Sequence, residues 1–277
     1  MDGTVRRLRA TFDNIAARYH AVRPSYPLET VDDLRRLAEL RTGSRALEIG
    51  CGTGQLTVPL AQLGVAVAAV ELGAALADVA RRNLAAYPSS EVIVGAFEDA
   101  ALADEAFDLV VAATSFHWVD PAIRVTKSAR VLRPGGYLAV IDTHHVAGGT
   151  EQFFRDAQDC YEMWDPATPP GLRLPTAGSI PVSKPDIDDS PLFEQAVLRR
   201  YVWEAEYSTS DYLTLMLTYS GHLALPSAQQ NGLLDCIGSL MDSRFGGTVT
   251  KRYLTELRVA RRRDRAVSRD PGATAQS

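Results

Sequence analysis

The sequence has few cysteines, no excess of positive charge and no long hydrophobic run. Its 3 cysteines, Cys51, Cys160 and Cys236, are odd in number and widely spaced, so the sequence predicts neither a disulfide framework nor a metal site and is typical of a reducing cytoplasm. The net charge of −5 gives no basic field to hold nucleic acid. No segment resembles a transmembrane helix or the apolar part of a signal peptide. We therefore expect a cytoplasmic protein that binds neither nucleic acid nor a membrane.

What the sequence does contain is a glycine-rich loop between an apolar segment and a helical pattern. Residues 46–49 are typical of a buried strand, and Gly50, Gly52 and Gly54 follow at alternate positions. Leucines at helical spacing come next. This order lets backbone N–H groups approach a ligand beside the positive end of a helix dipole. We interpret the loop as a small-ligand site, although a tight structural turn would show the same glycines.

The spacing of the glycines helps to identify the ligand. The dinucleotide pattern G-x-G-x-x-G is absent, because Gln55 stands where its third glycine would be. Glu48 lies two residues before Gly50, and a second acid, Glu71, ends the next apolar segment. Glu71 is about 20 residues from the loop, the offset at which an acid commonly binds ribose hydroxyls. An ordinary strand-terminal acid facing solvent is the alternative.

Apolar segments and helical patterns alternate along the first half of the chain. Further strands are predicted over residues 92–94, 107–113 and 137–141, and Pro121 suits the first turn of a helix between the last two. Continuous apolar strands of this kind belong to parallel sheets that are covered on both faces. The alternation predicts an α/β fold with a doubly wound sheet that binds ligands at the carboxyl ends of its strands.

Four features together resemble one protein family. The acidic, glycine-rich segment 48–54, Glu71, the segment 107–118 and the turn at 132–136 match, in order and spacing, the type 11 branch of the class I S-adenosylmethionine (SAM) methyltransferases. The residues Phe-His-Trp at 116–118 are most similar to the trans-aconitate methyltransferase group. The resemblance covers about residues 10–142. It implies a Rossmann-like, mostly parallel seven-stranded sheet with an antiparallel last strand and an inserted lid.

The resemblance also implies a cofactor, an activity and a set of site residues. SAM would donate a methyl group to a small molecule, and we expect the acceptor atom to be an oxygen of a carboxylate or hydroxyl. His117 would position the acceptor or act as its base. Cofactor binding is assigned to Tyr19, Arg23, Glu48, Gly50, Cys51, Gly52, Gln55, Glu71, Leu72, Ala96, Phe97, Ala113, Thr114 and Ser115, and substrate binding to Trp118, His145 and Tyr219.

Other functions stay open at this point. Methylation at carbon or nitrogen of a secondary metabolite would use the same cofactor. A SAM-binding regulatory protein without turnover would keep the same pocket. A nicotinamide-dependent oxidoreductase is disfavoured by Gln55, and base methylation in DNA is disfavoured because no Asn-Pro-Pro-Tyr or Asp-Pro-Pro-Tyr motif follows residues 107–113.

The chain is expected to divide into five segments. A helix is predicted over residues 4–20, and a proline-rich connection over 165–191 is typical of a lid or of a loop on the surface. The segments are a helical flap (1–44), a SAM-binding α/β core (45–145), a lid insertion (146–191), the C-terminal part of the sheet with helices (192–260) and a disordered tail (261–277).

Overall fold

The computed structural model describes residue 20 and residues 22–264 of the chain. Almost all of the helix predicted over residues 4–20, with Tyr19, lies outside the described residues, and so does most of the expected tail at 261–277. Among the described helices, none combines the length and apolar character that crossing a bilayer requires.

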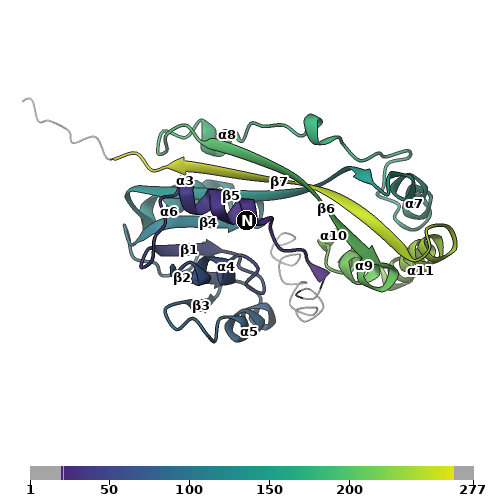
Figure 1. Ribbon diagram of the computed structural model, residues 1–277, viewed down its shortest axis with the longest axis horizontal. Coiled ribbons are helices and arrows are strands. Elements are labelled where there is room, and N and C mark those ends of the chain that lie inside the picture. Colours follow the sequence, from purple (N-terminus) through teal and green to yellow (C-terminus); the bar gives the residue numbers. More distant parts are fainter. Residues whose placement is uncertain (1–19, 21, 265–277) are drawn as a thin grey trace, which may run out of the picture.

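Within the described residues, seven strands form one sheet in the order β3-β2-β1-β4-β5-β7-β6 (Figure 1). Neighbours from β3 to β5 are parallel, and β7 runs antiparallel to both β5 and β6. The strands are β1 Arg45–Ile49, β2 Ala66–Glu71, β3 Glu91–Val94, β4 Phe107–Ala113, β5 Leu132–Gly149, β6 Val197–Ser208 and β7 Thr248–Arg261. This order confirms the predicted doubly wound, mostly parallel sheet with an antiparallel last strand.

Helices cover both faces of the parallel half of the sheet. Because side chains alternate between faces along a strand, Ala46 of β1 packs in the core on one face and Leu47 in the core on the other. Both faces of this part of the sheet are buried, which explains why its strands are apolar throughout. Helices α3 (Leu28–Leu37), α4 (Thr57–Gln62) and α5 (Ala74–Asn83) contribute to the first core, and α6 (Pro121–Val131) and α8 (Pro185–Asp188) to the second.

The last three strands are much longer than the others and continue into a second body. Beyond the parallel half of the sheet, β5, β6 and β7 lead to a group of helices (Figure 1). We call this group the helical lobe, and it consists of α7 (Glu151–Trp164), α9 (Thr209–Met216), α10 (Ser220–Leu223) and α11 (Ser227–Arg244). Its core contains Phe153, Leu215 and Ile237, which are fully buried. The lobe has its own hydrophobic core beside the carboxyl ends of the parallel strands.

Strand β5 is longer than the strand predicted over residues 137–141. It continues to Gly149 because residues 142–145 pair with β7, and a register shift follows between His145 and Gly149. The polar side chains after Ile141 hide this continuation from a hydrophobicity pattern. Strand β7 likewise runs to Arg261, and Arg262 is only 7% exposed, so ordered structure extends past residue 260.

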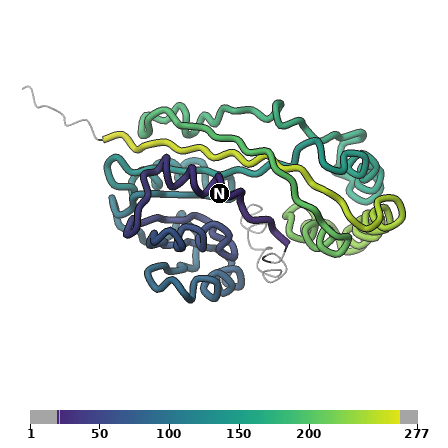
Figure 2. Tube along the Cα trace, viewed as in Figure 1, coloured from purple at the N-terminus to yellow at the C-terminus, as the bar shows by residue number. Residues whose placement is uncertain are grey.

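The long connection after α7 returns from the helical lobe toward α8 (Figure 2). Between residues 165 and 191 its regular structure is limited to a single 3-10 turn, Ala177–Ser179, and α8. Ion pairs fix the second half: Lys184 Nζ lies 2.5 Å from Asp142 Oδ2, and Arg124 lies 2.8 Å from Asp186. Residues 184–188 are therefore held against the sheet and α6.

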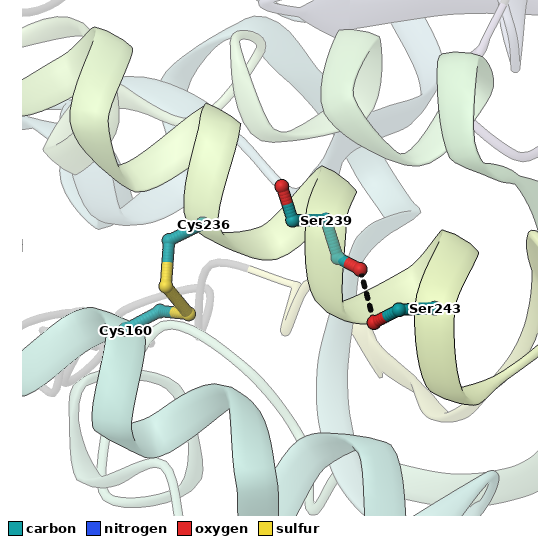
Figure 3. Close-up of a disulfide and its surroundings, with 4 residues drawn as sticks. All are labelled: Cys160, Cys236, Ser239 and Ser243. Atoms are coloured by element: carbon teal, nitrogen blue, oxygen red, sulfur yellow. Dashed lines mark hydrogen bonds between the residues drawn. A yellow bond between two sulfur atoms is a disulfide. The ribbon is translucent and has the colours of Figure 1, made fainter.

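The structure contradicts the prediction that the cysteines are unpaired. Cys160 of α7 and Cys236 of α11 form a disulfide with a Cα–Cα distance of 5.8 Å (Figure 3). Cys51 is free and buried. The two paired cysteines are 76 residues apart, and only the packing of α7 against α11 brings them together. The expectation of a reducing compartment loses its basis, because disulfides persist mainly in oxidising environments.

Candidate active site

Two cavities meet at the carboxyl ends of the parallel strands. The smaller, about 390 Å³, lies along the loops that follow β1, β2 and β4. The larger, about 520 Å³, lies between this edge of the sheet and the helical lobe. Arg23, Gly50, Thr114 and Tyr219 are among the residues that line both. Two ligands could therefore meet at this junction.

The glycine loop, residues 50–54, places backbone groups that no side chain covers at the junction of the two cavities. Gly50, Gly52 and Gly54 have φ angles of +69°, +57° and +93°, a region that side chains disfavour. A Cβ atom on Gly50 would lie 2.7 Å from the Cβ of Ser115. The Ser115 hydroxyl donates a hydrogen bond to the carbonyl of Ile49. The loops after β1 and β4 thus touch at Gly50, where only glycine fits.

Glu71 stands at the end of β2 as predicted, and the backbone fixes its orientation. The N–H groups of Gly52 and Gly73 donate to its two carboxylate oxygens, each at 2.9 Å. Glu71 lines the smaller cavity together with the apolar side chains of Leu72 and Phe97. Each carboxylate oxygen has a further lone pair, so Glu71 could accept hydrogen bonds from a diol between these apolar walls. Ala96 is buried and does not line either cavity.

Glu48 is buried on the other side of the glycine loop. It is 1% exposed, lines the larger cavity and accepts a 2.7 Å hydrogen bond from the Thr57 hydroxyl. Burial raises the pKa of Glu48 to about 7, against the lowering effect of Thr57, and the charge of Glu71 raises it further. A cationic ligand group in the cavity would favour its ionised form.

This shift predicts how stability depends on pH. The pKa of Glu48 is near 4.5 in the unfolded chain and near 7 in the folded protein. The contribution of Glu48 to the free energy of unfolding is therefore complete below about pH 4.5 and is lost as pH rises through 7, a decrease of about 3 kcal/mol. We expect this decrease to be absent in Glu48→Gln, which keeps an acceptor for Thr57. Urea unfolding as a function of pH measures it. Glu206→Gln, on an exposed part of β6, is the control, and an unchanged pH slope in Glu48→Gln would contradict the assignment.

Other residues assigned to the cofactor lie around the same junction. Thr114 has a φ of +57° and its hydroxyl lies 3.3 Å from that of Tyr26. Cys51 is buried in the glycine loop, and burial raises the pKa of its thiol well above the ordinary value. A thiol of this kind is a packing group, not a nucleophile. Gln55 lines the larger cavity, and no residue in the described part of the chain forms a hydrogen bond with its Nε2. Ala113 lines both cavities.

Arg23 is held at the junction by Thr218, a residue far away in the sequence. Its Nε donates to the Thr218 hydroxyl at 2.9 Å, and its terminal nitrogen donates to the Thr218 carbonyl at 2.8 Å. Its guanidinium lies 4.7 Å from the centre of the Tyr219 ring. The segment before α3 is thereby tied to the helical lobe across both cavities.

His117 and Trp118 lie away from the larger cavity. They belong to a 3-10 turn, Phe116–Trp118, with ring centres 5.0 Å apart, and both line the smaller cavity with Glu71. Of the expected acceptor residues, His145 lines the larger cavity and Tyr219 lines both. The structure therefore separates His117 and Trp118 from His145, although the sequence interpretation placed them around one acceptor, and Tyr219 lies where the two cavities meet.

The walls of the larger cavity are strongly aromatic. The strand register places His145 of β5 and Trp203 of β6 on either side of Tyr253 of β7. The ring centres of Trp203 and Tyr253 lie 4.7 Å apart in a stacked arrangement, and those of His145 and Phe154 lie 4.6 Å apart with the rings at 75°. Burial lowers the pKa of His145 to about 2, with a smaller effect from Lys251, so its imidazole is neutral. Its Nε2 has no hydrogen-bond partner among the described residues.

Sequence reasoning missed Lys251, which lies in this aromatic cavity. Lys251 is 3% exposed, and its Nζ donates a 2.8 Å hydrogen bond to the Tyr219 hydroxyl. The signal was the alternation in β7, where Val249, Lys251 and Tyr253 are all buried and share one face of the strand. A lysine at an inward position of a strand marks a polar site, because a lone charge is costly to bury.

Comparisons with known proteins show similarity to methyltransferases over about half of the chain. Residues 47–140 match the family model described as "Methyltransferase domain". An uncharacterized methyltransferase of Mycobacterium tuberculosis (strain ATCC 25618 / H37Rv) is 39% identical over 136 residues, 49% of this chain and 53% of that protein. A malonyl-[acyl-carrier protein] O-methyltransferase of Yersinia pestis is 30% identical over 132 residues, 47% of this chain and 48% of that protein. The chain thus spans about half the length of these curated relatives.

A solved structure extends the likeness to the remainder of the fold. A candidate type II methyltransferase from Anaeromyxobacter dehalogenans superposes with a TM-score of 0.59 at 22% identity, covering 86% of this chain and 97% of that chain. At this identity the likeness shows the fold alone. Residues 47–140 therefore match a methyltransferase domain, in a chain whose seven-stranded sheet has the Rossmann-like methyltransferase fold.

Proposed function

We propose that the protein is a SAM-dependent methyltransferase that methylates a small molecule at oxygen. The observation that supports this most strongly is the pair of joined cavities, one beside the acid of β2 and the other among aromatic side chains. A cofactor in the smaller cavity would present its reactive end at the junction. An acceptor in the larger cavity would reach the same point.

The residues around the smaller cavity fit this cofactor. Glu71 would accept hydrogen bonds from the ribose hydroxyls, and Leu72 and Phe97 would form the walls for the base. The bare backbone at Gly50 and the buried Glu48 would receive the methionine end, whose ammonium favours the ionised carboxylate. When bound, SAM supplies a methyl group on a positively charged sulfur. His117 and Trp118 would contact the cofactor rather than the acceptor.

The chain contributes alignment and the exclusion of water. Holding an acceptor and a methyl donor in line can supply several kcal/mol of the barrier reduction, on the order of 7–11 kcal/mol at best. Residues 146–191, as a lid, would contribute through α7 and through residues 165–175, of which Leu172 and Leu174 line the larger cavity. The lid would close the cavity over the acceptor.

The larger cavity favours a small acceptor with an oxygen function. Its volume of about 520 Å³ is in the range of small-molecule sites. Lys251 and Arg23 place two cationic side chains in its wall, and these would attract the oxygen of a carboxylate or a hydroxyl. The O-methyltransferase among the relatives is in accord with oxygen as the acceptor atom. Membership of the trans-aconitate methyltransferase group stays a prediction from residues 116–118.

We expect Glu71→Ala to weaken binding of S-adenosylhomocysteine by about 10- to 150-fold. The variant loses charge-assisted hydrogen bonds of roughly 1.5–3 kcal/mol and releases the Gly52 N–H. Isothermal titration calorimetry measures the affinity, with Glu91→Ala at the exposed start of β3 as the control. Equal affinities in the two variants would mean that Glu71 does not bind the ribose.

The activity itself is tested by product identification. The purified protein is incubated with SAM that carries an isotopically labelled methyl group and with a metabolite extract, and labelled products are identified by mass spectrometry. A labelled methyl ester or ether supports the proposal. A product that carries the labelled methyl group on carbon or nitrogen would show that the acceptor atom is not oxygen. Binding of S-adenosylhomocysteine without any labelled product would favour the regulatory alternative.

A further inference from the structure

Tyr219 stands where the two cavities meet. It precedes α10 in the helical lobe and lines both cavities, together with Gly50 and Thr114. A group at this junction is next to the point where, on the proposed function, an acceptor oxygen would meet the methyl donor. The hydrogen bonds and charges around the Tyr219 hydroxyl therefore determine whether it can accept a proton from the acceptor.

Lys251 is the first of these neighbours. Its ammonium is almost fully buried and donates to the Tyr219 hydroxyl at 2.8 Å. It also lies 4.9 Å from the centre of the Tyr219 ring and 5.2 Å from that of Tyr253. Among the described residues, Lys251 has no carboxylate ion-pair partner. A buried cation needs an anionic partner, and the phenol oxygen of Tyr219 is the group in contact with it that can become one.

Tyr219 also differs from the other tyrosines of the cavity. It accepts a hydrogen bond from Lys251, whereas the hydroxyl of Tyr253 lies 2.9 Å from that of Tyr207. Burial alone would raise the pKa of Tyr219, but the positive charges of Lys251 and Arg23 together with the hydrogen bond from Lys251 lower it below the ordinary value of 10.0. Within residues 22–264, the titratable and charged groups that face Tyr219 are Arg23, Tyr161, Tyr207, Tyr212, His222, Lys251 and Tyr253.

We propose that Tyr219, held as a phenolate by Lys251 and Arg23, is the base that removes the proton from a hydroxyl-bearing acceptor. The O–H bond of the acceptor breaks, its electron pair stays on the acceptor oxygen, and the proton bonds to the Tyr219 oxygen. The negative charge passes from Tyr219 to the acceptor beside the same two cations. This inference rests on the proposed methyltransferase function and narrows its acceptor to a hydroxyl compound, since a carboxylate has no proton to lose.

The ionisation of Tyr219 is tested on the protein without cofactor. The near-ultraviolet absorbance of ionised tyrosine is followed as pH rises, in the wild type and in Tyr219→Phe. Burial raises the pKa of six of the 10 tyrosines, Tyr137, Tyr161, Tyr201, Tyr207, Tyr212 and Tyr253. We expect one tyrosine that ionises below pH 10 in the wild type to be missing in Tyr219→Phe.

Two further variants make this titration decisive. Lys251→Met should shift the early ionisation to higher pH. Tyr201→Phe loses a hydroxyl that is bonded to Asp33 at 2.6 Å, outside both cavities, and should keep the early ionisation. Identical titrations of the wild type and Tyr219→Phe below pH 10 would overturn the proposal. A failure of the methyltransferase function would leave this result untouched, so the two can be told apart.

The catalytic role is tested on the acceptor that the labelling experiment identifies. We expect Tyr219→Phe to lower kcat by at least about 100-fold, the usual effect of losing a general base. Its affinity for S-adenosylhomocysteine should stay within about two-fold of the wild type, because the cofactor contacts on Glu71 and Gly50 are intact. A product methylated on a carboxylate oxygen, or a wild-type kcat in Tyr219→Phe, would refute the base assignment.

Discussion

Gly50→Ala is expected to weaken binding of S-adenosylhomocysteine by about 1,000-fold. The added Cβ would lie 2.7 Å from the Cβ of Ser115, at a residue whose φ is +69°. A non-glycine residue at such a φ costs of order 1–3 kcal/mol, and overlap with a packed neighbour costs a similar amount. The loop would relieve both by moving away from Ser115, and the backbone N–H groups would leave the junction. Calorimetric titration measures the loss.

Two variants separate loop geometry from a general loss of stability. Gly178→Ala makes the same change where nothing lies within 4 Å of the new Cβ, and it should bind like the wild type. Gly50→Ala/Ser115→Gly removes the collision and keeps the φ strain, so it should recover part of the affinity. If Gly50→Ala binds as tightly as Gly178→Ala while both remain folded, the glycine loop is not the cofactor site.

Cys160→Ser is expected to lower the free energy of unfolding by about 4 kcal/mol under oxidising conditions. The disulfide links residues that are 76 positions apart, and a cross-link over a loop of this length restricts the unfolded chain by about that amount in the chain-entropy description. It also joins α7 to α11 in the helical lobe (Figure 3). Urea unfolding in the absence of a reductant measures the difference from the wild type.

A reductant provides the control for the disulfide. Adding it should destabilise the wild type to the level of Cys160→Ser and leave Cys160→Ser unchanged, since the third cysteine, Cys51, is unpaired. Because α7 supplies Phe154, Gln158 and Tyr161 to the larger cavity, reduction should loosen the proposed acceptor wall as well. Equal stability of the wild type with and without reductant would show that the pair does not form in solution.

Much of the fold could be predicted from the sequence, because the patterns that indicate strands and helices are local or periodic. The buried strand β4 was predicted over residues 107–113, and the structure has it at Phe107–Ala113. Pro121 begins α6 as expected, with Asp120 capping the helix through the Ala122 N–H. Signals of this kind survive because strands covered on both faces must be apolar throughout. Polar continuations such as residues 142–149 of β5 have no comparable signal.

Contacts between residues that are distant in the sequence could not be predicted in the same way. Cys160 and Cys236 meet only because two helices pack together. Lys251 meets Tyr219 only because the first residues of β7 lie beside Tyr219, which precedes α10. His117 was expected at the acceptor, but the 3-10 turn after β4 places it along the smaller cavity.

The sequence by itself determined the parallel core and the glycine loop with its two acids, since backbone conformation and side-chain alternation follow from neighbouring residues. The tertiary structure alone decided the larger cavity. His145, Trp203 and Tyr253 come from three strands, and only the antiparallel register of β5, β7 and β6 sets them side by side. A shift of that register by one residue would turn these side chains to the other face of the sheet, and no local feature of the sequence fixes it.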